Sequence, residues 1–297
     1  MKSKKMFELV KNIISLVRMN HWVKNGFVFL PVFFAGKIEL IFTSNLLLLF
    51  ISFCLASSAI YILNDMVDVN ADKLHPTKKF RPIASGFFSI NQSIVLFTVT
   101  AILFFLSLLL LAHAGLYVLS YFVLNILYSF YLKHLSIVDV SSISAGFVLR
   151  ELAGGAESNV YVSHWMIIMT FLLTVSIGFA KRRDDLVLVL EKESSIKSLD
   201  GYTIPFLDIA KSISFSITLI SYILYSISAE VIARIGSDKL YITSLFVFLG
   251  IIRYIQITVV DKNSGSPIEV LWKDKFLQIT LLLWAFTFLF IIYGKGI

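Results

Sequence analysis

Charged residues are scarce in this sequence. Only 15% of its 297 residues are Asp, Glu, Lys or Arg, whereas 58% are hydrophobic, and the mean hydropathy is +0.85. Soluble domains carry about a quarter charged residues. The excess of apolar residues therefore excludes an ordinary soluble fold and predicts an all-α integral membrane protein. Little sequence is left between the apolar stretches, so we expect a single transmembrane domain over residues 1–297.

Cysteine is nearly absent as well. The one cysteine, Cys54, lies in an apolar run, which excludes an intramolecular disulfide framework. The sequence also lacks a convincing Ser-His-Asp or Cys-His arrangement for nucleophilic catalysis. The first 20 residues have no long apolar core and no small-residue cleavage site, unlike a secretory signal. Their apolar positions, from Met6 to Val17, predict an amphipathic helix on the membrane surface.

About nine apolar segments approach the length of roughly 20 residues that a helix needs to cross a bilayer. The first of them is interrupted by Pro31 and Gly36. We expect a bundle of about nine transmembrane helices near residues 25–41, 46–66, 90–111, 115–132, 137–155, 163–181, 208–230, 240–260 and 275–294.

Basic residues gather in every second loop of this arrangement. With a cytoplasmic N-terminus, the inner segments hold most of the lysines and arginines, and the outer ones hold only Lys37, Arg234, Lys239 and Lys295. This asymmetry follows the positive-inside rule. The formal net charge of +7 therefore indicates membrane orientation and no nucleic acid partner. The charged loops 67–89 and 181–207 would then face the cytoplasm from the inner membrane, with the active site among them.

An acidic cluster follows the second expected span. On a helix, Asn64, Asp68, Asp72 and Asp65 would project at about 0°, 40°, 80° and 100°, and so share one face. Clustered carboxylates repel one another unless cations neutralise them, and oxygen ligands suit Mg²⁺, which commonly bridges carboxylates to substrate phosphates. Acids that begin inside an apolar run are usually functional, although a solvated acidic loop is the alternative. We expect a Mg²⁺-diphosphate site here.

A basic loop comes directly after the acids. It contains His75, Lys78 and Arg81, stiffened by Pro76 and Pro82. Arginine suits bidentate phosphate contacts, and lysine acts as a point charge. The alternative to phosphate binding is that these residues are the ordinary positive charge of an inner loop. We expect His75 to be a hydrogen-bonding loop residue and not a metal ligand.

These two segments together, NDxxDxxxD followed by HPxKxxRPIASG, resemble the UbiA superfamily of intramembrane prenyltransferases. The resemblance covers nearly the whole chain. It implies a helical bundle around a central cavity that opens to the lipid, in which paired Asp-rich motifs bind Mg²⁺ and a diphosphate.

The second polar cluster departs from that family pattern. Most members carry a second DxxxD-type motif, whereas this chain reads Lys181-Arg182-Arg183-Asp184-Asp185. Lys181 and Asp185 are four residues apart and would meet on one helix face. The Lys-Arg-xx-acid form resembles the polyprenyl-phosphate phosphoribosyltransferase branch, which typically has glutamate at the position of Asp185. A basic stop signal beside the membrane is the alternative.

Other polar stretches resemble the same branch: Arg18 to Asn25, which includes Lys24; Tyr128 to Lys133; Arg150 to Gly155; Arg253-Tyr254; and Gly265 to Glu269, with Asp274 after them. Arg150 and Arg253 fall inside apolar spans, where a charge costs at least about 2.5–3.5 kcal/mol. Each could face substrate or tie helices together. Lys133 could hold a phosphate or snorkel to the interface, and Asp139 fits a helix-terminus acid.

The resemblance implies Mg²⁺-dependent transfer of phosphoribosyl from phosphoribosyl diphosphate to a polyprenyl phosphate. An enzyme of the same fold that transfers a prenyl group from a prenyl diphosphate is one alternative, and a transporter is another, although no internal repeat supports a transporter. The candidate residues are Asn64, Asp68, Asp72 and Asp185 for metal; Asp65, Asp68, Asp72, Lys181 and Asp185 for catalysis; and Lys24, Lys78, Arg81, Tyr128, Lys133, Arg150, Arg182 and Arg253 for substrate.

Overall fold

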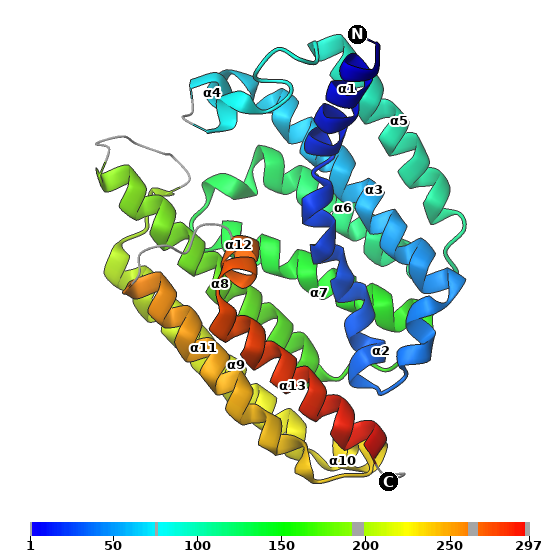
Figure 1. The fold of residues 1–297 in the computed structure, drawn as a ribbon, viewed down its shortest axis with the longest axis vertical. Helices are drawn as coiled ribbons and strands as arrows, with labels where there is room; N and C mark the ends of the chain where they lie inside the picture. Colours follow the sequence, from blue (N-terminus) through cyan, green and yellow to red (C-terminus); the bar gives the residue numbers. More distant parts are fainter. Residues whose placement is uncertain (1, 75–76, 192–198, 261–266, 295–297) are drawn as a thin grey trace. The chain divides into compact units, whose positions relative to one another are not determined.

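The computed structural model describes residues 2–74, 77–191, 199–260 and 267–294, and the regular structure in these ranges is entirely helical (Figure 1). This confirms the predicted all-α fold. The chain divides into two compact units. Residues 1–32, 38–129 and 149–161 form the first unit, and residues 33–37, 130–148 and 162–297 form the second.

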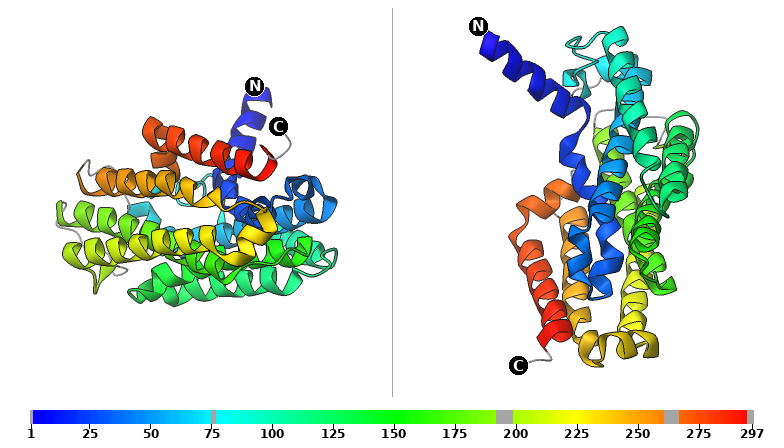
Figure 2. Two further views of the ribbon diagram at one scale, coloured as in Figure 1. Left: turned by 90° about the horizontal axis from the view of Figure 1, so that it is seen from below. Right: turned by 90° about the vertical axis from the view of Figure 1, so that its right-hand side faces the viewer.

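The helices of the first part of the chain are α1 (Lys2–Leu16), η1 (Met19–Phe29), α2 (Leu30–Phe34), η2 (Ile38–Phe42), α3 (Ser44–Val67), α4 (Val69–Leu74), η3 (Lys78–Phe80), α5 (Ile90–Leu108) and α6 (Gly115–Phe130). Those of the second part are η4 (Leu132–His134), α7 (Val138–Ser158), α8 (His164–Glu191), α9 (Ile204–Ile227), α10 (Ala229–Ile235), η6 (Lys239–Thr243), α11 (Ser244–Val259), α12 (Pro267–Lys273) and α13 (Lys275–Tyr293). Within the first unit α3 packs along α5, and within the second α8 packs along α9 and α11 along α13 (Figure 2).

Six helices in the described ranges are long and apolar enough to cross a membrane: α3, α5, α8, α9, α11 with the η6 turn before it, and α13. They correspond to six of the nine expected spans. The expected span 25–41 is wrong as a single helix, because this segment consists of part of the 3-10 helix η1, the five-residue α2 and the start of η2. A turn at Gly36, with φ of +68°, separates α2 from η2.

The other two expected spans are helices with different properties. The segment expected at 115–132 forms α6, which is apolar but only 16 residues long. The segment expected at 137–155 forms α7, which has 21 residues but includes Asp139, Arg150, Glu151 and Glu157. These charged side chains are buried in the protein. With them, α7 is not apolar enough to count among the membrane-spanning helices.

The N-terminal helix α1 has a buried end and an exposed beginning. Leu16 is fully buried and packs with Ile62, Ile83 and Phe88 of the first unit. Met6 and Phe7 expose 67% and 70% of their surface, so α1 presents apolar side chains outward at its start. This pattern is compatible with the predicted amphipathic helix, and its position on a membrane surface stays a prediction.

The second half of α7 approaches the backbone of η1 closely. A Cβ atom at Gly154 would collide with the backbone carbonyl of Val28, which cannot move aside as a flexible side chain could. Nearby, the Glu157 carboxylate accepts hydrogen bonds from the backbone N–H groups of residues 112, 113 and 114 at 2.9–3.0 Å, just before α6 begins. Glycine and a buried carboxylate thus fix α7 to the segments around it in the first unit.

We expect Gly154→Ala to lower the thermal midpoint of the detergent-purified protein. Overpacking against a rigid neighbour typically costs about 1–3 kcal/mol. The matched control is Gly250→Ala on α11, where a new Cβ would make an ordinary contact of 3.9 Å with Thr280. Thermal unfolding of both variants measures the difference. Equal midpoints for Gly154→Ala and the wild type would show that η1 moves aside freely.

Candidate functional site

The acidic cluster lies where α3 passes into α4. Asn64 and Asp65 are on the last turn of α3, Asp68 caps its C-terminus, and Asp72 is on α4. Backbone hydrogen bonds from Asp68 N–H to Asn64 and from Asp72 N–H to Asp68, at 2.9 and 2.8 Å, carry the helical turn across the junction. Asp65 and Asp72 are buried, with 2% and 3% exposure, and Asn64 and Asp68 are half-buried.

Two arginines neutralise the buried acids of this cluster. The Arg81 guanidinium lies between them, with Nη1 at 2.6 Å from Asp72 Oδ2 and 3.2 Å from Asp65 Oδ1. Arg18 donates to the same Asp65 oxygen at 2.5 Å, and its guanidinium lies 4.6 Å from the centre of the Tyr61 ring. The structure therefore brings together Asp65, Asp72 and Arg81, and it adds Arg18, which the sequence placed in a family-like stretch without predicting its pairing with Asp65. An arginine just before an apolar segment was the available signal.

The chemistry of this cluster fits Mg²⁺. Its possible metal ligands are all oxygen atoms, and Mg²⁺ is typically held by one or two carboxylates together with substrate phosphates. Among the described residues, no group of three or more Asp, Glu, His or Cys side chains is placed to hold a metal ion. Asn64, Asp68 and Asp72 are the residues that would hold the ion. Asp185 belongs to the second unit and stays a predicted ligand.

Arg150 is tied into the first unit by side chains from other helices. Its Nε donates to Asn25 Oδ1 at 2.9 Å, and Nη2 donates to the Tyr121 hydroxyl at 2.8 Å. Its guanidinium also lies 4.3 Å from the Tyr121 ring centre and 5.6 Å from that of Phe53. These contacts favour the inter-helix tie over the substrate role for this buried arginine.

The second cluster lies on α8, in the second unit. The Arg182 Nε donates to Asp139 Oδ2 at 2.6 Å, and Arg182 Nη1 lies 3.6 Å from Asp185 Oδ2. Lys181 is exposed, and its expected pairing with Asp185 stays a prediction. Asp139 lies in the first turn of α7, as expected, but it is fully buried and accepts a hydrogen bond from Arg182. Sequence reasoning placed it at a helix end and missed its pairing with Arg182.

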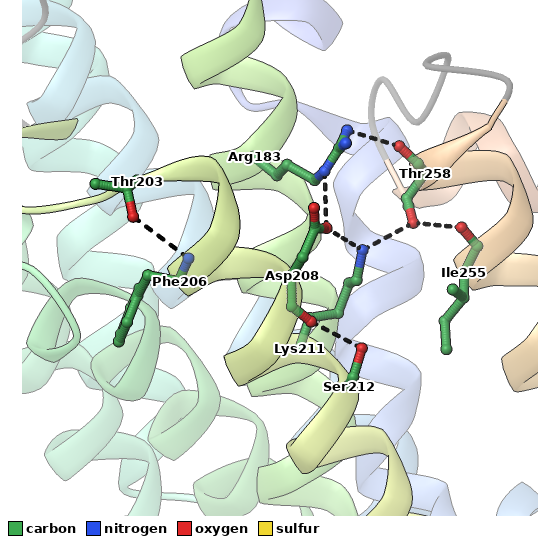
Figure 3. Close-up of polar contacts among 8 residues, drawn as sticks. All are labelled: Arg183, Thr203, Phe206, Asp208, Lys211, Ser212, Ile255 and Thr258. Carbon is green, nitrogen blue, oxygen red and sulfur yellow. Dashed lines mark hydrogen bonds and ion pairs between the residues drawn. The ribbon is translucent and has the colours of Figure 1, made fainter.

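A second ionic network on α8 and its neighbours was also missed. Arg183 Nε and Lys211 Nζ both donate to Asp208 Oδ1, at 2.8 and 2.9 Å (Figure 3). The same two cations reach Thr258 of α11, through its carbonyl at 2.9 Å and its hydroxyl at 3.3 Å (Figure 3). Lys211 is only 1% exposed. Its position inside an apolar span was the signal that could have drawn attention to it.

Arg253 pairs with Asp274, which caps the N-terminus of α13. Arg253 Nη2 lies 2.7 Å from Asp274 Oδ2, and Asp274 Oδ1 accepts from Leu277 N–H at 2.8 Å. These hydrogen bonds hold the pKa of Asp274 below its ordinary value. The pairing favours the helix-tie alternative for Arg253, which joins α11 to α13.

The remaining candidates differ in their exposure. Lys24, Tyr128 and Lys133 are half-buried, and Lys78 is exposed beside Arg81 in sequence. Their assignment to substrate binding stays a prediction. His75 and the Gly265-Ser266 stretch lie outside the described residues, and the side chain of Glu269 is likewise not described.

Comparisons with known proteins agree on one family. Residues 26–281 match the UbiA prenyltransferase family. The decaprenyl-phosphate phosphoribosyltransferase of Corynebacterium glutamicum is 30% identical over 294 residues, which cover 96% of this chain and 88% of that protein. The protein of the same name from Mycolicibacterium smegmatis is 30% identical, with 94% of this chain and 92% of that protein covered.

Solved structures show the same fold at lower identity. A UbiA homolog from Archaeoglobus fulgidus bound to DMAPP and Mg²⁺ has a TM-score of 0.69 and 16% identity, covering 96% of this chain and 99% of that chain. The same homolog bound to GPP and Mg²⁺ has a TM-score of 0.70 and 17% identity, with 94% and 99% covered. The protein is a multi-pass membrane transferase, and it belongs to the UbiA prenyltransferase family.

Proposed function

We propose that this enzyme transfers the 5-phosphoribosyl group of phosphoribosyl diphosphate to a polyprenyl phosphate, with Mg²⁺, and releases diphosphate. The observation that carries the proposal is the cationic form of the second cluster. Where most of the family has paired acids, α8 presents Lys181 and Arg182 ahead of Asp185. The similarity of nearly the whole chain to two decaprenyl-phosphate phosphoribosyltransferases supports the same donor.

The donor carries more phosphate oxygens than a prenyl diphosphate, because its ribose bears a 5-phosphate as well as the diphosphate. Additional cations suit this extra negative charge. The candidate side chains for binding these oxygens are Arg81, Lys78, Lys181 and Arg182. Arg81 already orients toward Asp72 and Asp65, so its guanidinium is held beside the proposed metal ligands.

The reaction breaks the bond between ribose C1 and the diphosphate oxygen, and it forms a bond between C1 and an oxygen of the lipid phosphate. A bound Mg²⁺ would stabilise the negative charge of the departing diphosphate. The acceptor phosphate is already anionic at neutral pH, so the step needs no general base. This agrees with a sequence that offers no candidate catalytic triad.

The substrates also fit the expected placement of the protein. The polyprenyl tail partitions into the bilayer, and the donor is water-soluble. A site at the cytoplasmic surface of the inner membrane would meet both. We propose this location for the active site because it places the acidic cluster and the Lys181 segment on the side predicted by the distribution of basic residues.

The donor assay tests the function directly. Purified enzyme in lipid vesicles is supplied with Mg²⁺, a polyprenyl phosphate and ribose-labelled phosphoribosyl diphosphate, and parallel samples receive labelled prenyl diphosphates with an aromatic or lipid acceptor. We expect labelled lipid product only in the samples that receive phosphoribosyl diphosphate, and none when a chelator is added. Consumption of only the prenyl diphosphates would replace this function by UbiA-type prenyl transfer.

Substitutions in the acidic cluster test the metal assignment. We expect Asp68→Asn and Asp72→Asn to lower kcat by about a hundredfold or more, because each removes a proposed anionic ligand while keeping the side-chain size. Turnover is measured against Mg²⁺ concentration beside the control Asp238→Asn, at an exposed residue just before η6, which should match the wild type. Near-normal turnover and Mg²⁺ dependence in both cluster variants would place the metal site elsewhere.

Lys181→Ala distinguishes donor binding from a basic stop signal. Because Lys181 is exposed on α8, its removal should leave folding intact and raise the KM for phosphoribosyl diphosphate by about tenfold, the effect of one lost contact to a charged group. Steady-state kinetics with varied donor measure this. The control is Lys239→Ala in η6, with an unchanged KM expected. An unchanged KM in Lys181→Ala would support the stop-signal alternative.

A further inference from the structure

A chain of short hydrogen bonds in the second unit joins the start of α7 to α8 through a loop tyrosine. The backbone N–H of Ile137 donates to the Tyr202 hydroxyl oxygen at 2.6 Å. The Tyr202 hydroxyl donates to Asp139 Oδ1 at 2.6 Å. The other oxygen of Asp139, Oδ2, accepts from Arg182 Nε at 2.6 Å. Each oxygen of this buried carboxylate therefore has its own donor.

Two residues beside this chain of hydrogen bonds have positive φ angles, and one of them, Ile137, is strained. Ile137 has φ of +70°, although a β-branched residue rarely adopts the left-handed region. Gly201, beside Tyr202, has φ of +87°, which glycine adopts without strain, and a Cβ atom there would lie 2.9 Å from Ser136 Oγ. Strain such as that at Ile137 persists only where the surrounding structure fixes it, and it gathers at functional sites. Here it directs the Ile137 amide toward Tyr202 and brings the loop against the start of α7.

The tyrosine is suited to donate to Asp139 over a wide pH range. Tyr202 is buried, with 6% exposure. Its burial and its hydrogen bond to the Asp139 carboxylate raise the pKa of Tyr202 above the ordinary tyrosine value, because both disfavour a phenolate. Tyr202 thus keeps its proton and holds one side of the carboxylate, while Asp139 holds the Nε edge of Arg182.

We propose that Asp139 and Tyr202 are positioning residues that fix the direction of the Arg182 guanidinium, so that Arg182 binds a diphosphate oxygen of the donor. This inference rests on the proposed function of Arg182 in donor binding. A guanidinium is planar, so fixing its Nε edge also fixes the plane in which its two terminal nitrogens lie. An arginine already held in place loses less side-chain entropy on binding an anion. If Asp139 served only as a favourable negative charge at the N-terminus of α7, it would need neither Tyr202 nor Arg182 as a partner.

A double-mutant cycle on the donor tests the proposal. Tyr202→Phe removes only the hydroxyl, and it should raise both the donor KM and the dissociation constant of labelled donor, measured by equilibrium binding with Mg²⁺, by about five- to tenfold. The kcat should stay within about twofold. In an Arg182→Gln background the same substitution should change neither quantity further, because its effect passes through Arg182.

Asp139→Asn is taken through the same cycle, so that a folding failure of one variant leaves the other to decide. Tyr241→Phe, at an exposed tyrosine in η6, is the matched control and should bind donor as the wild type does. Thermal midpoints are recorded for every variant. The proposal is overturned if Tyr202→Phe lowers the midpoint and kcat while donor affinity is unchanged, or if its effect on affinity is the same with and without Arg182.

Failure of the proposed function gives a different result. If the wild type transfers nothing from phosphoribosyl diphosphate but consumes a prenyl diphosphate, the phosphoribosyl assignment is wrong. The cycle is then run on the KM of that prenyl donor, because its diphosphate offers Arg182 the same kind of oxygen atoms. Coupling between Tyr202 and Arg182 would then support the positioning role with the other donor, and its absence would refute it.

Discussion

Pairing of buried carboxylates with arginine guanidinium groups holds both polar clusters of this protein at the ends of apolar helices. Asp65 and Asp72 in the first unit, and Asp139 in the second, are 0–3% exposed. An ionised carboxylate in such surroundings loses most of its hydration, and an arginine offers both the opposite charge and several hydrogen-bond donors. Arg81 and Arg182 make these contacts at 2.6 Å.

Pairing of this kind suits a site for anionic substrates. A buried ion pair is weak evidence for stability, because desolvation offsets much of the attraction between the charges. In the proposed function, its value lies in placing the candidate phosphate-binding and metal-binding groups before the substrate arrives. Arg81 is held by two acids at one cluster, and Arg182 by one acid at the other. The cations that would receive a diphosphate are thus preorganised in each unit by residues that lie behind them.

Other polar side chains within the helices serve to join them. Arg150 links Asn25 and Tyr121, Arg183 and Lys211 share Asp208, and Glu157 accepts three backbone N–H groups. Helices in lipid gain little from the hydrophobic effect against one another, so close packing and hydrogen bonds between them carry more weight. A charged residue inside a span is therefore an ambiguous sign of function, as Arg150 and Arg253 illustrate.

The sequence by itself determined the membrane class, the helical fold, the family motif from Asn64 to Asp72 and the basic residues that follow it. These properties follow from local patterns: apolar length, helical spacing and the order of charges along the chain. Tertiary structure decided which charges pair. These partners lie far apart in the sequence, and no local pattern predicts their pairing. Examples are Arg18 with Asp65, Asp139 with Arg182 and Tyr202, and Lys211 with Thr258. The tertiary structure also divided the expected first span at Gly36 and buried the charged residues of α7. The physical reason is that burial of a charge depends on partners from other helices, and only the packed fold brings those partners within hydrogen-bond distance.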